Sequence, residues 1–240
     1  MIPLEEIVER PPIVHGGVAT WGISPELAHF LDAHLPPAAV ALETGAGLST
    51  IVILRRGVTR HISVTPYPGE FEAIRAYCAS VGIATASWEP VTASSLDWLP
   101  SATLPPLDLV LIDGAHAFPA PFIDWYYTAE ALKVGGLMVV DDLQLVTGRI
   151  LADFMRADAK WDQVHRDHRF AVYRKRVHPV RDERDWLAQP WVANSNPVAR
   201  VRVIRAGPVR LALSFAARAC VQPSLIKRAF RLWLRRPPSA

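Results

Sequence analysis

The chain has 240 residues with a formal net charge of +3, which is enough for one full α/β domain with an appended segment. Half of the residues are hydrophobic and a fifth are charged, as in an ordinary globular protein. The two cysteines, Cys78 and Cys220, lie far apart, which excludes a disulfide framework and a thiolate metal set, so we expect a cytoplasmic protein.

Two further absences bear on the location. The N-terminal stretch MIPLEEIVERPP is acidic and has no apolar core, so we expect no signal peptide. No run of 18 or more apolar residues occurs, so we expect no membrane-spanning helix.

The charge is unevenly distributed along the chain. Residues 177–240 hold 12 Lys and Arg residues against 3 Asp and Glu residues, whereas residues 1–176 hold 14 basic and 20 acidic ones. A mildly acidic body followed by a strongly basic tail indicates two segments with different physical roles.

The first half of the chain alternates between helical and strand patterns. Ser24 can cap a helix over 24–35, in which Pro25 suits the first helical position. The short apolar run 38–44 then predicts a buried strand. Apolar spacing and chain breakers predict, in order, a helix over 48–57, a strand over 60–66, a helix over 69–83 and a strand over 83–90.

The second half continues the alternation. The stretch 105–116 carries four consecutive apolar residues from Leu109 to Ile112, which is typical of a strand covered on both faces. After it we expect a helix over 120–134, a strand over 137–142, a helix over 148–159 and two strands joined by a tight turn within 161–176.

This order predicts the fold. Five strand–helix units and a closing pair of strands indicate a Rossmann-like, doubly wound α/β fold with a mostly parallel seven-stranded sheet and an antiparallel terminal strand. We expect an N-terminal helical segment over 1–37 on the lid or substrate side, a core over 38–176 and a basic helical extension over 177–240.

Polar residues gather at the carboxyl ends of the expected strands, where open α/β sheets bind ligands. Glu43, Thr44, Gly45, Ala46 and Gly47 end the first strand. The two glycines permit a tight turn, and the helix that follows would direct free backbone N–H groups into the cleft. A dinucleotide fold would have a third glycine where this chain has Thr50, and Glu43 would repel a pyrophosphate.

The fourth and fifth strands end in carboxylates. Asp113, Gly114 and His116 follow the fourth strand, and Asp141 and Asp142 follow the fifth. Because these strand ends are neighbours, the three aspartates are expected to converge. Three oxygen donors suit Mg²⁺ or another divalent cation, although strand-end aspartates can also cap helices without metal. His116 can act as a base near neutral pH or serve as a hydrogen-bonded structural residue.

The stretches LETGAG, LDLVLIDGAHAF and LKVGGLMVVDDLQL together resemble the class I S-adenosylmethionine-dependent methyltransferases over roughly residues 38–176. The pattern is closest to the small-molecule O-methyltransferases that act on catechols and macrolide sugars. The resemblance implies S-adenosylmethionine as cofactor. It assigns cofactor binding to Glu43, Thr44, Gly45, Ala46, Gly47, Ser49, Thr65, Ser94, Asp113 and Gly114.

The chain departs from this family at two of those positions. The carboxylate that the family places on the ribose, at the end of the second strand, falls on Thr65. The acidic residue that the family often has near the adenine falls on Ser94. The resemblance also implies a metal held by Asp113, Asp141 and Asp142, and it places His116 where catechol-type enzymes carry a catalytic lysine, with Asp113 beside the reacting groups.

Other residues have simpler readings. His165 and His168 are expected to be solvated turn residues, and Trp125, Tyr126 and Tyr127 to pack in the core. Trp21 is left between a lid over the site and a packing role.

The basic tail contains one amphipathic stretch. Residues 224–236 place apolar side chains on one helical face and Lys227, Arg228, Arg231 and Arg235 on the other. Such a helix can lie on the anionic inner surface of a membrane, pack on its own domain or on the second subunit of a homodimer, or contact nucleic acid. Nucleic acid is the least favoured of these, because no RNA-binding motif accompanies it.

The sequence therefore predicts an enzyme that transfers a methyl group from S-adenosylmethionine to a hydroxyl of a small molecule, a sugar or a phenol, with or without a divalent metal. Two alternatives stay open. One is a nicotinamide-dependent oxidoreductase, which Glu43 and Thr50 argue against. The other is a degenerate, non-catalytic scaffold that its basic tail recruits to a membrane or a partner.

Overall fold

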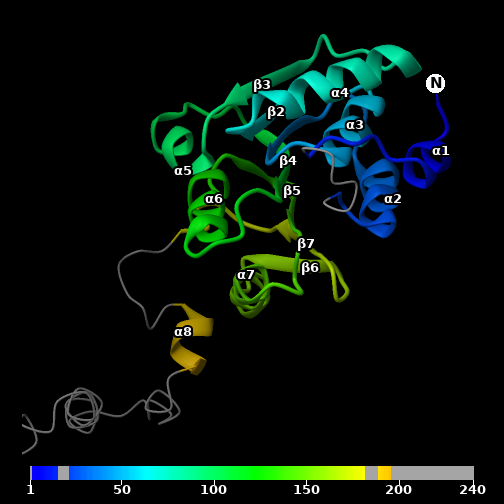
Figure 1. Cartoon of the computed structure of the whole chain (residues 1–240). Helices are drawn as coiled ribbons and strands as arrows, with labels where there is room; N and C mark the ends of the chain where they lie inside the picture. The colour runs from blue at the N-terminus through cyan, green and yellow to red at the C-terminus, as the bar shows by residue number, and fades with distance from the viewer. Residues whose placement is uncertain (1, 16–21, 182–188, 196–240) are drawn as a thin grey trace, which may run out of the picture. The chain divides into compact units, whose positions relative to one another are not determined.

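The computed structural model describes residues 2–15, 22–181 and 189–195 (Figure 1). The chain divides into two compact units, 1–182 and 183–240. Of the second unit the structure describes one short helix, α8 (Pro190–Ser195). The stretch 224–236 and Trp21 lie outside the described residues. Among the residues described, no helix is both long and apolar enough to cross a membrane.

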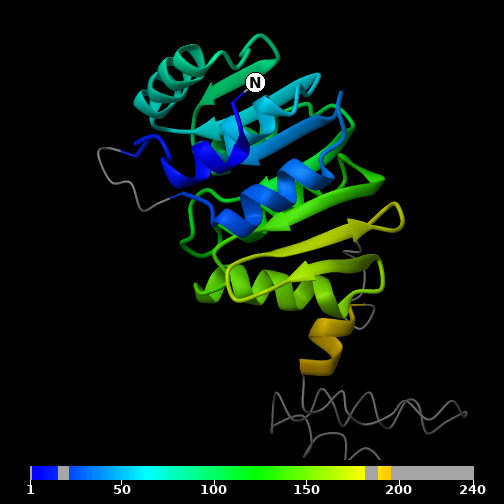
Figure 2. The ribbon, with the colours of Figure 1, turned by 90° about the vertical axis from the view of Figure 1, so that its right-hand side faces the viewer.

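A seven-stranded sheet forms the centre of the first unit, in the order β3-β2-β1-β4-β5-β7-β6. The strands are β1 (Val40–Thr44), β2 (Arg60–Thr65), β3 (Trp88–Thr92), β4 (Leu107–Ile112), β5 (Leu132–Val140), β6 (Trp161–Arg166) and β7 (Ala171–Lys175). β1 to β5 pair in parallel, and β7 runs antiparallel to both β5 and β6. Figure 2 shows the β6–β7 hairpin closing the sheet at the end opposite β3. The predicted fold class is confirmed: β7, the last strand of the chain, is the antiparallel one, and it lies between β5 and the edge strand β6.

Helices cover both faces of this sheet (Figure 1). One face packs against α1 (Leu4–Glu9), α2 (Pro25–His34), α3 (Leu48–Arg55) and α4 (Pro68–Val81). The other face packs against α6 (Ala120–Thr128) and α7 (Val146–Ala157). A short α5 (Ser95–Trp98) and a 3-10 turn (Leu99–Ser101) precede β4.

Alternation along the strands explains why two cores form. Each face of the sheet has its own hydrophobic cluster: the first lies under α1 to α4 and the second under α6 and α7. Ala41 and Leu109 point into the first cluster, whereas Leu42 and Val110, one position further along, point into the second. Because successive side chains of a strand face opposite sides, a continuous apolar run is buried on both. This is the physical origin of the apolar stretches that predicted the strands.

The helix predicted over 24–35 shows how local signals set an element. The Ser24 side chain accepts a hydrogen bond from Leu27 N, and Pro25 occupies the first turn, as the sequence predicts. The helix ends at His34, before the proline pair.

Two predicted elements are displaced. The third strand was expected over 83–90 but is β3, which begins at Trp88. The helix expected over 120–134 ends at Thr128, and β5 already begins at Leu132, so Gly135 and Gly136 lie inside a strand. Gly135 has a φ of 88° there, and the β4–β5 register shifts between Leu107 and Leu109.

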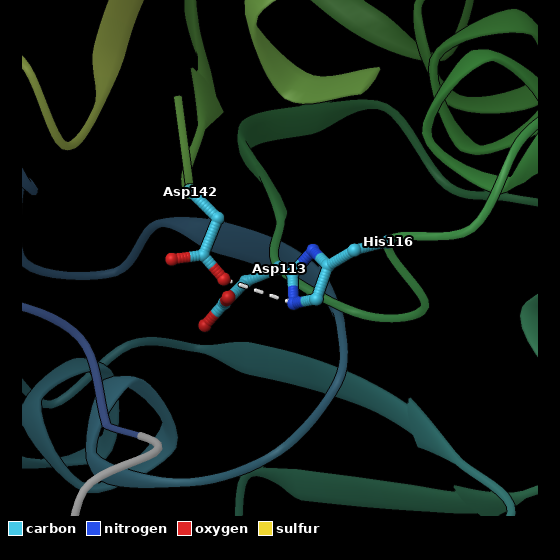
Figure 3. A group of neighbouring side chains, drawn as sticks. All are labelled: Asp113, His116 and Asp142. Carbon is cyan, nitrogen blue, oxygen red and sulfur yellow. Dashed lines mark ion pairs between the residues drawn. The ribbon is translucent and has the colours of Figure 1, made fainter. Parts of the chain in front are cut away.

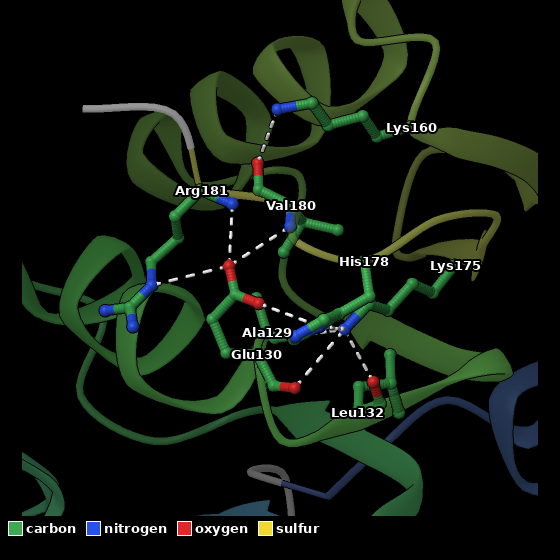
Figure 4. Close-up of polar contacts among 8 residues, drawn as sticks. All are labelled: Ala129, Glu130, Leu132, Lys160, Lys175, His178, Val180 and Arg181. Atoms are coloured by element: carbon green, nitrogen blue, oxygen red, sulfur yellow. Dashed lines mark hydrogen bonds and ion pairs between the residues drawn. The ribbon is translucent and has the colours of Figure 1, made fainter. Parts of the chain in front are cut away.

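The early end of α6 has a tertiary cause, shown in Figure 4. The buried amine of Lys175 on β7 donates hydrogen bonds to the carbonyls of Ala129, Glu130 and Leu132 at 2.8, 3.3 and 2.6 Å. These carbonyls have no helical partner once α6 stops, and a cation near them also complements the negative end of the helix dipole. A residue more than 40 positions away therefore caps the carbonyls that follow this helix.

The segment after β7 is tied to the same place (Figure 4). The Glu130 carboxylate accepts from the backbone N–H groups of Val180 and Arg181, at 3.1 and 2.7 Å, and pairs with His178 at 3.0 Å. Lys160 Nζ donates to Val180 O at 3.0 Å. The first residues of the predicted extension, 177–181, are therefore bound to the core domain.

Candidate active site

A cavity of about 530 Å³ opens at the carboxyl ends of the parallel strands. Backbone pairing brings these ends together: Asp113 N donates to Thr44 O and Asp141 N donates to Ile112 O, both at 3.1 Å. Residues that follow β1, β2, β3, β4 and β5 all contribute to the cavity wall. The cavity lies where ligands bind in open α/β sheets.

The glycine turn after β1 requires glycine at one position for two reasons. Gly45 has a φ of 102°, which L-residues rarely adopt, and a Cβ atom on it would lie 2.5 Å from Asp113 O. Gly45 N also donates to Val64 O at 2.8 Å. This turn therefore holds the ends of β1, β2 and β4 at van der Waals contact.

Glu43 lies behind this turn rather than in the cavity wall. Its carboxylate is buried and accepts hydrogen bonds from Ser49 Oγ (2.6 Å), Ser63 Oγ (2.7 Å) and the hydroxyl of Thr50, and it pairs with His61 Nε2 at 2.9 Å. Burial alone would raise the pKa of Glu43, but His61 and the hydroxyls of Ser49 and Thr50 outweigh it and lower the pKa.

Two of the predicted cofactor residues lie outside the cavity wall, and the others line it. Glu43 and Thr44 are buried and outside the cavity wall, so Glu43 acts on the site by fixing the turn through Ser49 and Thr50. The structure does bring the other predicted members together as cavity-lining residues, namely Gly45, Ala46, Gly47, Ser49, Thr65, Ser94, Asp113 and Gly114. Their contact with a cofactor stays a prediction.

The predicted catalytic and metal residues line the same cavity at the ends of β4 and β5. Asp113, His116 and Asp142 each offer a ligand atom within 4.8 Å of the others (Figure 3). His116 Nε2 lies 2.9 Å from Asp142 Oδ2. Asp141 lines the cavity but does not belong to this group, so the structure gathers a histidine with two aspartates instead of three aspartates.

Asp142 reaches this position through an unusual backbone. Its φ is 55°, in the left-handed region, and a Cβ atom on Gly148 would lie 2.9 Å from both Asp141 O and Asp142 O. The first turn of α7 therefore packs directly against the end of β5, and only glycine fits at position 148. Strained conformations of this kind are often found at functional sites.

The carboxylates titrate differently because their surroundings differ. Loss of hydration, followed by the charges of Asp141 and Asp142, raises the pKa of Asp113 well above its ordinary value. Burial raises the pKa of Asp141 to about 6. The hydrogen bond to His116 lowers the pKa of Asp142. Arg169, 3.7 Å from Asp142, adds one positive group, so the cluster remains rich in negative charge.

Two cavity residues on the β2 side were not predicted from the sequence. Glu70, in the first turn of α4, and His15, in the N-terminal segment, both line the cavity. Thr65 Oγ1 donates to Glu70 Oε2, and His15 Nδ1 pairs with Glu70 Oε1, both at 2.8 Å. A signal was present, since Glu70 follows Thr65 by five residues, but nothing in the sequence indicated that His15 returns to this place.

The remaining aromatic and histidine residues have structural contacts. His165 stacks on Phe170 with ring centroids 4.6 Å apart and pairs with Asp167 at 3.1 Å. Trp125 is buried in the second hydrophobic cluster. The group of possible metal ligands found among the described residues does not include His165 or His168.

Comparisons with known proteins agree with this arrangement. The family model described as "Methyltransferase domain" matches residues 42–143, which run from β1 to the residue after Asp142. A comparison with curated proteins found no significant match.

Among solved structures the chain is similar to cofactor-bound Rv0187 from MTB, with 23% identity, a TM-score of 0.55 and coverage of 65% of this chain and 82% of that one. It is also similar to the O-methyltransferase TomG from Streptomyces achromogenes in complex with SAM, with 18% identity, a TM-score of 0.53 and coverage of 67% of this chain and 84% of that one. A third similar structure is the O-methyltransferase from Bacillus cereus in complex with SAH, with 18% identity, a TM-score of 0.55 and coverage of 73% of this chain and 93% of that one. At these identities the likeness establishes the fold.

Two independent comparisons thus agree with the resemblance that the sequence motifs indicated: residues 42–143 match a model of a methyltransferase domain, and the chain shares its fold with solved structures that include O-methyltransferases.

Proposed function

We propose that this protein transfers the methyl group of S-adenosylmethionine to a hydroxyl of a small molecule such as a sugar or a phenol. One observation carries the proposal. A single cavity contains both the glycine turn of Gly45 and Gly47 and a His–Asp cluster, which consists of Asp113, His116 and Asp142. Both lie inside the segment that matches the methyltransferase family. O-Methyltransferases among the similar structures support the choice of a hydroxyl acceptor.

The bound cofactor would supply an electrophilic methyl group on a sulfonium. The residues of this chain have the remaining tasks, which are to bind, to align and to move one proton. Gly45, Gly47 and Ser94 line the part of the cavity assigned to the cofactor, while His116 and Asp142 line the part assigned to the acceptor. Alignment of the two reactants in one cavity supplies much of the rate enhancement in such a transfer.

His116 is positioned to take the proton of the acceptor hydroxyl. Its Nε2 faces Asp142 Oδ2 at 2.9 Å, and a hydrogen bond there leaves Nδ1 as the nitrogen that accepts a proton. A carboxylate that fixes the tautomer in this way also stabilises the imidazolium once the proton has moved. In this version Asp113 and Asp142 act by charge, and no metal takes part.

A metal-assisted version uses the same residues differently. Two carboxylates and an imidazole within 4.8 Å of one another fit the donor set of a divalent cation. The imidazole shifts the preference from Mg²⁺ towards Mn²⁺, Fe²⁺ or Zn²⁺. Such a cation would lower the pKa of the acceptor hydroxyl, with Asp113, His116 and Asp142 as its ligands and His116 no longer available as a base.

One set of measurements tests the proposal and separates the two versions. Calorimetry with S-adenosylmethionine and with S-adenosylhomocysteine tests cofactor binding, and transfer of a tritiated methyl group to a panel of phenols and sugars tests the reaction. Full activity in EDTA together with a loss of about 100-fold or more in His116→Ala supports the base. Loss of activity in EDTA that Mn²⁺ restores supports the metal.

Two outcomes contradict the proposal. Binding of NAD in place of S-adenosylmethionine would assign the protein to the oxidoreductases. Failure to bind S-adenosylmethionine or S-adenosylhomocysteine at millimolar concentration would favour a non-catalytic scaffold.

A second proposal concerns the basic stretch 224–236, which would hold the protein on an anionic membrane surface. The support is the sequence pattern of apolar and basic residues. Liposome sedimentation of the full chain and of a chain without residues 208–240 tests it. Equal sedimentation of both proteins with anionic liposomes would reject the membrane role.

A further inference from the structure

We propose that Glu70 binds the ribose hydroxyls of the adenosyl cofactor, and that Thr65 and His15 are the positioning residues that hold its carboxylate. This inference rests on the proposed use of S-adenosylmethionine. It replaces the expectation that Thr65 itself stands where a ribose-binding carboxylate would be.

The position of Glu70 in the cavity is the first support. Four carboxylates line the cavity among the described residues, and three of them, Asp113, Asp141 and Asp142, follow β4 and β5. Glu70 instead lies in the first turn of α4, just after β2, with Val64 and Thr65 also in the wall. It is therefore the carboxylate that stands apart from the His–Asp cluster, on the β2 side of the glycine turn.

The hydrogen-bonding capacity of Glu70 is the second support. An ionised carboxylate has about four lone-pair positions. Thr65 Oγ1 uses one on Oε2, and His15 Nδ1 uses one on Oε1, each at 2.8 Å. No further partner of these two oxygens lies within the described ranges, so one position on each is left, which matches the two adjacent hydroxyls of a ribose. The side chain is 13% exposed, so these positions are reached from the cavity rather than from bulk solvent.

The order of elements is the third support. In nucleotide-binding sheets a carboxylate about 20 residues beyond the glycine turn accepts the ribose hydroxyl, because that distance leads through one helix to the end of the next strand. Glu70 follows the glycine turn, α3 and β2 in this way, but it reaches back from the first turn of α4. The hydroxyl of Thr65 at the strand end is then not a weak substitute, since it orients the carboxylate that replaces it.

His15 connects this carboxylate to the glycine turn. A Cβ atom on Gly47 would lie 3.1 Å from His15 Nε2, so the imidazole ring stands directly against the turn while its Nδ1 holds Glu70. The N-terminal segment thus forms one wall of the cofactor part of the cavity.

The test compares the affinity of each protein for two ligands, S-adenosylhomocysteine and its analogue that lacks the ribose 2′-hydroxyl. The proteins are the wild type, Glu70→Gln and, as matched control, Glu72→Gln, which changes an exposed glutamate on the same helix. The wild type and the control should prefer the ribose ligand by about 10-fold or more, as expected for a hydrogen bond to a charged acceptor. In Glu70→Gln this preference should fall to within about 2-fold.

The ratio of the two affinities, for the ligand with and the ligand without the ribose 2′-hydroxyl, distinguishes a lost ribose contact from a general loss of folding, because misfolding weakens both ligands equally. If Glu70→Gln weakens both ligands equally, or leaves the ratio unchanged, Glu70 does not contact the ribose and the inference is wrong. If the wild type binds neither ligand, the proposed function itself fails. His15→Ala should reduce the ratio in the wild-type background but not in Glu70→Gln, because a residue that positions the Glu70 carboxylate affects ribose recognition through that carboxylate. An equal effect in both backgrounds would reject this positioning role.

Discussion

The ring of His61 lies against the carboxylate of Glu43, with Nε2 2.9 Å from Oε1, and both side chains are almost completely buried. The first residue of the glycine motif is thus bound from β2 and from the start of α3 before any ligand arrives. Glu43 therefore holds the glycine turn in place, and we expect its replacement to lower the stability of the fold.

Glu43→Gln should lower the free energy of unfolding by about 1–3 kcal/mol at pH 7, because a neutral amide leaves buried hydroxyls and an imidazole poorly paired. The pKa of Glu43 is lowered in the folded protein from its ordinary value of 4.5. The stabilisation is therefore present above that value and is lost as the pH falls through the folded pKa. Urea unfolding from pH 7 to pH 3.5 measures it; a difference between the two proteins that stays constant over this range would contradict the assignment.

Gly45→Ala should be far more harmful than Gly82→Ala. Both glycines have a positive φ, 102° and 73°, so both variants carry backbone strain of about 1 kcal/mol. Only at Gly45 would the new Cβ atom meet another group, the carbonyl of Asp113 at 2.5 Å. We expect Gly45→Ala to lose several times the stability lost by Gly82→Ala, together with cofactor binding. Thermal unfolding and calorimetry compare the two; equal losses would show that the Asp113 loop yields freely.

Asp124→Asn should stabilise the protein at neutral pH. Neither carboxylate oxygen of Asp124 has a partner at full hydrogen-bonding geometry within the described ranges. Burial raises the pKa of Asp124 to about 6, and the nearby side chains of Ser95 and Thr44, whose contacts are too weak to count as full hydrogen bonds, oppose this only in part. The folded state then binds a proton that the unfolded state has released, so stability falls as the pH rises from about 4 to 6. Asparagine removes this cost.

The gain in Asp124→Asn should be on the order of 2 kcal/mol at pH 7.5 and should vanish near pH 4. Chemical unfolding at both pH values measures it. Asp97→Asn, a change at an exposed carboxylate, serves as the control and should show no such pH-dependent gain. A gain for Asp124→Asn of the same size at both pH values would contradict the raised pKa.

Lys175→Met should destabilise the core domain by about 3 kcal/mol or more, because it leaves the carbonyls of Ala129, Glu130 and Leu132 without their donor in a buried place. Lys133→Met removes a half-exposed amine that pairs with Asp108 and should cost less than about 1 kcal/mol. Urea unfolding compares the two variants, and hydrogen exchange at Leu132 and Lys133 reports whether α6 still ends at Thr128. Similar costs for both lysines would mean that α6 ends for local reasons.

Some elements could be predicted from the sequence because their causes are local. The cap of Ser24, the apolar run from Leu109 to Ile112 and the glycine turn after β1 each act within a few residues of the structure that they set. Alternation of strands and helices then leaves few topologies, and a parallel sheet places Asp113 and Asp141 at one edge. This is why fold class and the position of the cavity follow from the sequence.

Other features depended on distant residues. The end of α6 depends on Lys175, and the antiparallel strand is inserted beside β5 because the β6–β7 hairpin folds back on the sheet. The composition of the His–Asp cluster depends on the left-handed backbone of Asp142, which turns that side chain towards His116. A pattern of three strand-end aspartates cannot reveal which two of them will face a histidine.

The sequence by itself determined the parallel sheet, the glycine turn and the carboxylates at its edge, because short-range hydrophobic periodicity and backbone sterics produce all three. Only the tertiary structure decided what Glu43 and Glu70 do, because both are defined by partners far away in the chain. His61 and Ser63 keep Glu43 behind the turn, whereas Thr65 and His15 hold Glu70 in the cavity. Long-range packing sets the direction in which each carboxylate points, so Glu43 lies behind the turn and Glu70 lines the cavity.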